Sequence, residues 1–214
     1  MIISPGRRYI FVHIPKTGGT SFAAALETRA MSDDLLIGDT PKARRRKGRL
    51  KGLQTAGRLW KHSTLADIDG ILSPEEIAKL QVVTLVRNPW DRLVSYYAWA
   101  RDATFDHPVV RAAKTLGFGE FVADPAVAQG IEGSPAAQYV TDRTGQEHPA
   151  IFARIECAAD DLQPFWDHLD FRLDLPRLNF SDRRANYRDY YDAATRAHVA
   201  VIASADIGRF GYEF

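Results

Sequence analysis

One cysteine and the absence of any long apolar run exclude several classes of protein. Cys157 is the only cysteine among 214 residues, so no disulfide can form within the chain and a cysteine-rich metal site is excluded. No stretch approaches the roughly 20 apolar residues that a membrane-spanning helix needs. The first apolar run, Tyr9 to Ile14, is too short for a signal peptide, and Lys16 follows it closely. We therefore expect a soluble, cytoplasmic protein that needs no metal.

Net charge is also nearly absent, but the charges are unevenly spread. The formal charge is +1 at pH 7, which gives no sign of a polyelectrolyte partner. Residues 42–61 nevertheless contain nine Lys and Arg and no Asp or Glu, whereas the rest of the chain has 19 Lys and Arg against 27 Asp and Glu. This basic segment could dock an anionic or sugar-rich acceptor, or it is a mobile, solvated loop. It has no aromatic residue before Trp60, so we expect no nucleic-acid partner.

The hydrophobic pattern predicts strands that alternate with helices. Since 45% of the residues are hydrophobic, the chain can bury one substantial core, and we expect a single domain over residues 1–214. Buried strands are predicted at residues 8–14, 80–86 and 150–155, and helices at 20–31, 89–101, 158–169 and 193–205, with two short helices within 108–123. This order predicts an α/β protein with a P-loop-like fold, in which helices flank a central parallel sheet.

The segment IFVHIPKTGGTSF, residues 10–22, has the composition of an anion-binding turn between a strand and a helix. Gly18 and Gly19 would let backbone amides approach an oxyanion, and the helix N-terminus adds partial positive charge. The side chains that could contribute a charge or a hydroxyl donor are Lys16, Thr17, Thr20 and Ser21. The alternative is an ordinary glycine turn before a helix.

This turn does not have the Walker A pattern of nucleoside triphosphatases. That pattern is GxxxxGK[ST], in which the lysine follows the glycines and precedes the hydroxyl that binds Mg²⁺. Here Lys16 precedes the glycines, and no apolar run that ends in Asp offers an obvious Walker B partner. A phosphate-containing ligand other than a triphosphate with Mg²⁺ is therefore favoured.

A second segment, VTLVRNPWDRLVSYY at residues 83–97, also ends a predicted strand with a cation. Arg87 could pair with a phosphate through two hydrogen bonds, and Ser95 lies about two helical turns further on, where its hydroxyl could bind the same group. The alternative is that Arg87 forms an ion pair with Asp91 or caps the helix.

HIPKTGGTSF resembles the 5′-phosphosulfate loop of sulfotransferases that use 3′-phosphoadenosine 5′-phosphosulfate (PAPS). The similarity is to the carbohydrate branch that includes heparan 2-O-sulfotransferase and its bacterial relatives. The second segment is similar to that family's 3′-phosphate motif, which implies that Arg87 and Ser95 bind the 3′-phosphate. The C-terminal LPRLNFSDRRANYRDYYDAAT and FGYEF also resemble these bacterial enzymes, in which Asn-x-Ser precedes a Tyr-Arg-x-Tyr-Tyr helix. On this resemblance Arg183, Arg184 and Arg188 would close over the nucleotide, or they belong to a solvated basic turn.

The resemblance implies transfer of a sulfuryl group from PAPS to a hydroxyl of a carbohydrate or polysaccharide, with PAP as the product and no metal. Lys16 would stabilise the leaving phosphate, and His62, which precedes a Thr-x-x-Asp-Ile stretch, would be the base. His13 is the alternative base. Two other functions stay open: a P-loop kinase that uses ATP-Mg²⁺ on a small molecule, and a non-catalytic nucleotide-binding protein.

Overall fold

A computed structural model describes residues 1–175 and 183–214, and these residues divide into two compact units. The first unit contains residues 1–86 and 136–175, and the second contains residues 87–135 and 183–214. The expected single domain over the whole chain stays a prediction. Each unit has its own hydrophobic core.

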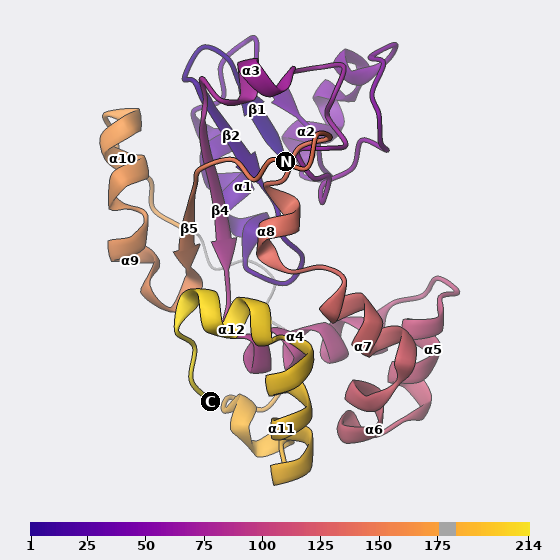
Figure 1. Ribbon diagram of the computed structural model, residues 1–214. Helices are drawn as coiled ribbons and strands as arrows, with labels where there is room; N and C mark the ends of the chain where they lie inside the picture. Colours follow the sequence, from indigo (N-terminus) through magenta and orange to yellow (C-terminus); the bar gives the residue numbers. More distant parts are fainter. Residues whose placement is uncertain (176–182) are drawn as a thin grey trace. The chain divides into compact units, whose positions relative to one another are not determined.

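The first unit contains a five-stranded sheet in the order β3-β1-β2-β4-β5 (Figure 1). Its strands are β1 (Ile2–Ser4), β2 (Tyr9–Val12), β3 (Leu35–Leu36), β4 (Gln81–Val86) and β5 (Ala150–Arg154). The neighbours β2, β4 and β5 are parallel, as predicted, whereas β1 runs antiparallel to both β2 and β3. The α/β class is thus confirmed. The predicted parallel sheet is confirmed for β2, β4 and β5 only, because β1 makes the five-stranded sheet mixed. Strands of three and two residues are too short to leave a periodic signal.

Helices cover the sheet of the first unit and complete its core. Aromatic side chains of β2 meet helix α1 (Gly19–Thr28) and helix α10 (Gln163–Leu169): the ring centroids of Phe11 and Phe22 are 4.9 Å apart, and those of Tyr9 and Phe165 are 5.3 Å apart. The remaining helical elements are α2 (Pro41–Arg46), η1 (Lys47–Leu50), α3 (Pro74–Ile77), α8 (Ala136–Tyr139), η2 (Ile155–Cys157) and α9 (Ala158–Asp161). The predicted helix at 158–169 is therefore divided into α9 and α10.

In its described residues the second unit is helical. It contains α4 (Pro89–Asp102), α5 (Pro108–Thr115), α6 (Phe118–Ala123), α7 (Pro125–Glu132), η3 (Tyr187–Tyr190), α11 (Ala193–Ile202) and α12 (Ser204–Phe210). Helix α4 begins as predicted, because the Asn88 side chain accepts a hydrogen bond from the Trp90 amide and Pro89 occupies the first turn. Helices α7 and α12 are not among the elements predicted from the sequence. The core gathers around Val94, Phe121 and Val199, which are fully buried.

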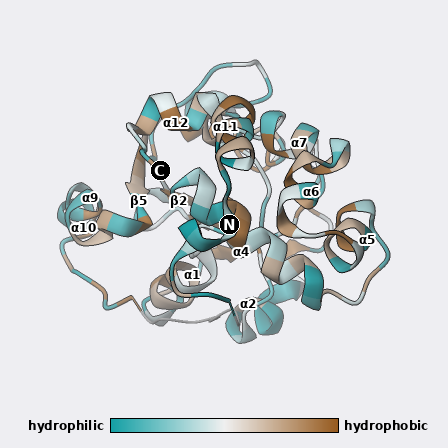
Figure 2. Cartoon of the chain, turned by 90° about the horizontal axis from the view of Figure 1, so that it is seen from below, coloured by the Kyte–Doolittle hydropathy of each residue, from teal (hydrophilic) through white to brown (hydrophobic). Residues whose placement is uncertain are grey.

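The basic segment at residues 42–61 begins with regular structure. Thr40 caps α2 by accepting the Ala43 amide, and Ala43 is buried in the core of the first unit. The Arg46 guanidinium donates to the carbonyl of Met31 at 2.7 Å. Helix α2 is largely hydrophilic in colour (Figure 2), as its sequence PKARRR requires. None of the helices in the described part of the chain is long and apolar enough to cross a membrane.

Candidate functional site

The predicted anion-binding turn connects β2 to α1 in the first unit. Two of its residues have left-handed backbone conformations: Lys16 has φ 66° and Gly18 has φ 83°. The Gly18 carbonyl accepts hydrogen bonds from the amides of Ser21 and Phe22, at 3.0 and 3.3 Å, and so closes the first turn of α1. The N-cap residue of α1 is Gly18, which has no side chain to cap the helix. A helix begins with amides that lack intrahelical acceptors, and such amides could bind an anion here; anion binding by this turn stays a prediction.

The hydroxyl groups of the turn have different surroundings. Thr17 is 1% exposed, and its hydroxyl donates to the carbonyl of Ile14 at 2.9 Å. Its proton is therefore used within the turn, and its hydroxyl maintains the turn's shape. Thr20 and Ser21 lie half-buried in the first turn of α1, and Lys16 is also half-buried.

His13 lies against the start of α1 and explains the glycine at position 19. A Cβ atom on Gly19 would lie 2.1 Å from Cδ2 of the His13 ring, far inside van der Waals contact. The His13 ring is 5% exposed and stacks on Phe11, with centroids 5.8 Å apart. Burial lowers the pKa of His13 well below its usual value, and the nearby His62 lowers it further. Its environment is that of a neutral, packed core histidine.

The backbone carbonyl of His13 holds the ring of His62. The Nδ1 atom of His62 lies 2.7 Å from this oxygen, and the two ring centroids are 4.5 Å apart. A carbonyl oxygen only accepts hydrogen bonds, so Nδ1 must carry the proton. In the neutral ring, Nε2 then has a free electron pair and is the basic atom.

His62 is neutral at physiological pH. Burial is the largest cause that lowers its pKa, to about 4, and the charge of Lys61 lowers it further, whereas the hydrogen bond to His13 acts in the opposite direction. From the sequence, His62 is a candidate base only through the family resemblance. The structure adds that its ring is oriented by the residue that packs against the anion-binding turn.

A tight turn fixes the backbone around His62. Ser63 is fully buried, and its Oγ lies 2.9 Å from the carbonyl of Trp60 and 3.0 Å from that of Arg58, and accepts the Trp60 amide at 3.0 Å. The next residues are tied to the segment before β5, since the Leu65 amide donates to the carbonyl of Tyr139 at 3.0 Å. Ser63 is not among the residues predicted from the sequence, because the local pattern around a serine does not indicate that it is buried.

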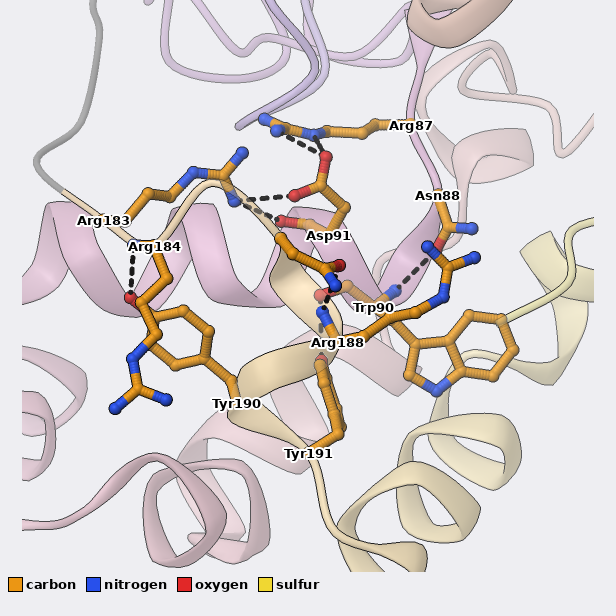
Figure 3. Close-up of polar contacts among 10 residues, drawn as sticks. Arg87, Asn88, Trp90, Asp91, Arg183, Arg184, Arg188, Tyr190 and Tyr191 are labelled. Carbon is orange, nitrogen blue, oxygen red and sulfur yellow. Dashed lines mark hydrogen bonds and ion pairs between the residues drawn. The ribbon is translucent and has the colours of Figure 1, made fainter.

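A second cluster of charged residues lies in the second unit. Asp91 accepts hydrogen bonds from Arg87, at 2.8 Å from Nε and 2.6 Å from Nη2 (Figure 3). Its other carboxylate oxygen accepts from Nη1 of Arg183 at 2.6 Å. The three side chains are between 14% and 19% exposed. Arg87 is thus paired with Asp91, the alternative weighed from the sequence, and Arg183 adds a second guanidinium to the same carboxylate.

The other residues of the second unit that are predicted to bind the nucleotide differ from one another in burial and in the groups they contact. Ser95 is 7% exposed and lies in α4. Arg184 and Arg188 are exposed: Arg184 lies over the ring of Tyr190 at 5.5 Å and donates to the carbonyl of Asp189, and Arg188 lies over Tyr187 at 4.8 Å. Their role in nucleotide binding stays a prediction.

The resemblance of the C-terminal region rests partly on the Asn-x-Ser motif, residues 179–181, which lies outside the described residues. Within residues 1–175 and 183–214, no group of three His, Cys, Asp or Glu side chains is arranged to hold a metal ion. Neither a family model nor a curated protein matches the chain.

Proposed function

We propose that this protein is a sulfotransferase that moves a sulfuryl group from PAPS to the hydroxyl of a carbohydrate acceptor. The observation that carries the proposal is the pairing of His62 with the anion-binding turn through His13. The His13 ring packs on Gly19 at the turn, while its carbonyl orients His62 so that Nε2 is the basic atom. An anion site beside an oriented neutral base suits transfer of an anionic group to a hydroxyl.

Each predicted site residue discussed here for the first unit has a role in the proposed reaction. His62 Nε2 takes the proton from the acceptor hydroxyl while the acceptor oxygen forms a bond to sulfur. The bond from sulfur to the bridging phosphate oxygen breaks, and its electron pair leaves with PAP. Lys16 and the amides at the start of α1 stabilise the negative charge that grows on this phosphate. Thr20 and Ser21 supply hydroxyl donors to the same group, and Thr17 holds the turn.

The second cluster would serve the 3′-phosphate. Arg87 is assigned to it, with Ser95, by the resemblance of their segment. Asp91 accepts hydrogen bonds from the guanidiniums of both Arg87 and Arg183, which brings two cationic side chains together in this cluster. The proposal keeps the cytoplasmic location expected from the sequence.

Two other functions are less well supported. A kinase would need Mg²⁺ bridging the phosphates of ATP, and the lysine of this turn precedes its glycines instead of following them. A non-catalytic nucleotide-binding protein has no need of an oriented base, so it leaves the geometry of His62 unexplained.

Calorimetric titration of the purified protein with PAP, alongside ATP-Mg²⁺, tests the proposal. We expect micromolar binding of PAP and no binding of ATP-Mg²⁺. Lys16→Ala should abolish transfer in a folded protein, while Lys114→Ala, which changes an exposed lysine of α5, should leave it unchanged. Binding of ATP-Mg²⁺ without preference for PAP would contradict the proposal and favour the kinase.

The assignment of Arg87 has a separate test. Adenosine 5′-phosphosulfate lacks the 3′-phosphate, so Arg87→Ala should weaken PAP binding far more than it weakens binding of this ligand. Equal losses for the two ligands would remove Arg87 from the 3′-phosphate site but leave the donor class intact.

A further inference from the structure

Trp60 lies two residues before His62 and is 45% exposed. The ring centroids of Trp60 and His62 are 4.9 Å apart, and the rings are nearly perpendicular, at 85°. In such a pair the edge of one ring points at the face of the other. Whichever ring supplies the edge, at least one face of the indole is not covered by His62.

The backbone around Trp60 is held in place by Ser63. The buried Ser63 hydroxyl accepts the Trp60 amide at 3.0 Å, and the Ser63 amide donates to the Trp60 carbonyl at 3.1 Å. These bonds fix Trp60 and His62 in one turn. The exposed indole therefore belongs to the same turn that positions the His62 base. In this respect Trp60 differs from the single exposed apolar side chains that are common on protein surfaces.

We infer that Trp60 is a specificity-determining residue that binds the acceptor sugar. A pyranose ring would stack its apolar C–H face on the indole, with one of its hydroxyls turned toward Nε2 of His62. Stacking would remove exposed apolar surface of the indole from water, and it would restrict the acceptor to one plane beside the base. This inference rests on the proposed sulfotransferase function and adds a named acceptor-binding residue to it.

The chain offers a matched control. Trp99, in helix α4 of the second unit, is 40% exposed and stacks on Tyr96, with centroids 5.7 Å apart. Trp99→Ala therefore removes an indole of similar exposure from a different setting. Trp60→Phe keeps an aromatic face beside His62, whereas Trp60→Ala removes it.

The experiment measures transfer of radiolabelled sulfate from PAPS to two probes, an unsulfated chondroitin hexasaccharide and cellohexaose, and measures PAP binding by calorimetry. With a sugar that is an acceptor, Trp60→Ala should raise its KM about tenfold or more and leave PAP affinity unchanged. Trp60→Phe should recover most of the loss, and Trp99→Ala should behave as the unmodified protein.

The other outcomes overturn the inference in distinguishable ways. An unchanged KM in Trp60→Ala, or a loss of PAP binding in both Trp60 variants, shows that the indole does not bind the acceptor. If the protein binds PAP but transfers sulfate to neither sugar, the inference that a sugar stacks on Trp60 is wrong, whereas PAPS remains the proposed donor. Single-stranded oligothymidine that binds through Trp60 would identify a nucleobase as the stacking partner instead. Failure of the unmodified protein to bind PAP removes the proposed function itself, and the inference with it.

Discussion

A single backbone carbonyl determines which nitrogen of His62 can act as a base. The carbonyl oxygen of His13 accepts a hydrogen bond from Nδ1, which keeps its proton, so the electron pair of Nε2 is available at neutral pH. His13, the alternative base, is 5% exposed and packs on Phe11 and Gly19. Its geometry suits a residue that positions His62, and its own ring has little access to an acceptor.

Replacement of His62 tests this division of roles. His62→Ala should slow transfer by about 10²- to 10⁴-fold, because a positioned base is worth that much, and it should leave PAP affinity nearly unchanged. Single-turnover transfer and calorimetry measure the two quantities. His107→Ala, at an exposed histidine of the second unit, is the control. Loss of PAP binding in a folded His62→Ala protein would show instead that His62 shapes the donor site.

The turn between β2 and α1 combines backbone conformation with close packing. Gly18 is required by its left-handed backbone, and Gly19 by the His13 ring that would collide with a Cβ atom. Two adjacent glycines therefore have two different structural reasons. Both glycines maintain the backbone at the start of α1, where the leaving phosphate is proposed to bind.

Gly19→Ala is expected to destabilise the protein by about 1–3 kcal/mol, because the His13 ring must move out of a packed position. The displaced ring should also misplace His62 and lower the transfer rate. Gly130→Ala is the matched control: Gly130 lies in α7 with nothing within 4 Å of the added Cβ, so the same change should stabilise by about 0.5–1 kcal/mol. Urea unfolding gives both free energies, and equal effects at the two glycines would contradict the role of Gly19.

The shared carboxylate of Asp91 connects helix α4 to the chain before η3. Its two oxygens accept from Arg87, four residues earlier, and from Arg183, 92 residues later. A carboxylate with two guanidiniums is well compensated, and without it each partly buried guanidinium would lose a charge-assisted hydrogen bond.

Asp91→Asn should lower the free energy of unfolding by about 1–3 kcal/mol, since charge-assisted hydrogen bonds from two guanidiniums are lost. Denaturant unfolding measures the loss. A double-mutant cycle with Arg183→Ala then isolates the long-range pair. Strict additivity in that cycle would show that Arg183 and Asp91 do not interact in solution.

The first unit contains a half-buried histidine, His62, whose lowered pKa makes the stability of the unit sensitive to acid. The pKa of His62 falls from 6.5 in the unfolded chain to about 4 in the folded protein, mainly through burial. Between these values the unfolded chain binds a proton that the folded protein does not, so stability falls as the pH falls from 6.5 toward 4. Below about pH 4 His62 contributes no further change.

His62→Gln should therefore reduce the acid sensitivity of the whole protein. Between about pH 7 and pH 5, the loss of unfolding free energy should be smaller in His62→Gln by about 1–2 kcal/mol, a value reduced for partial solvent screening. Urea unfolding at the two pH values measures it, with His107→Gln as the control. An identical pH dependence in His62→Gln would mean that the His62 ring is solvated in the folded protein.

Local sequence patterns determined the elements that carry the site. The helix predicted from residue 89 begins there as α4, and the strands predicted at residues 8–14 and 80–86 contain β2 and β4. The capping box of Ser73 and Glu76 at the start of α3 is equally local. These signals are local, because caps and periodic burial act within a few residues of one another.

Only the tertiary structure decided the features that depend on residues far apart in the chain. The antiparallel edge of the sheet pairs Ile2 with Leu36, the proton position in His62 depends on a carbonyl 49 residues away, and Asp91 is shared with Arg183. Such hydrogen bonds leave no periodic signal, since their partners are brought together by the packing of whole elements and not by their neighbours in sequence.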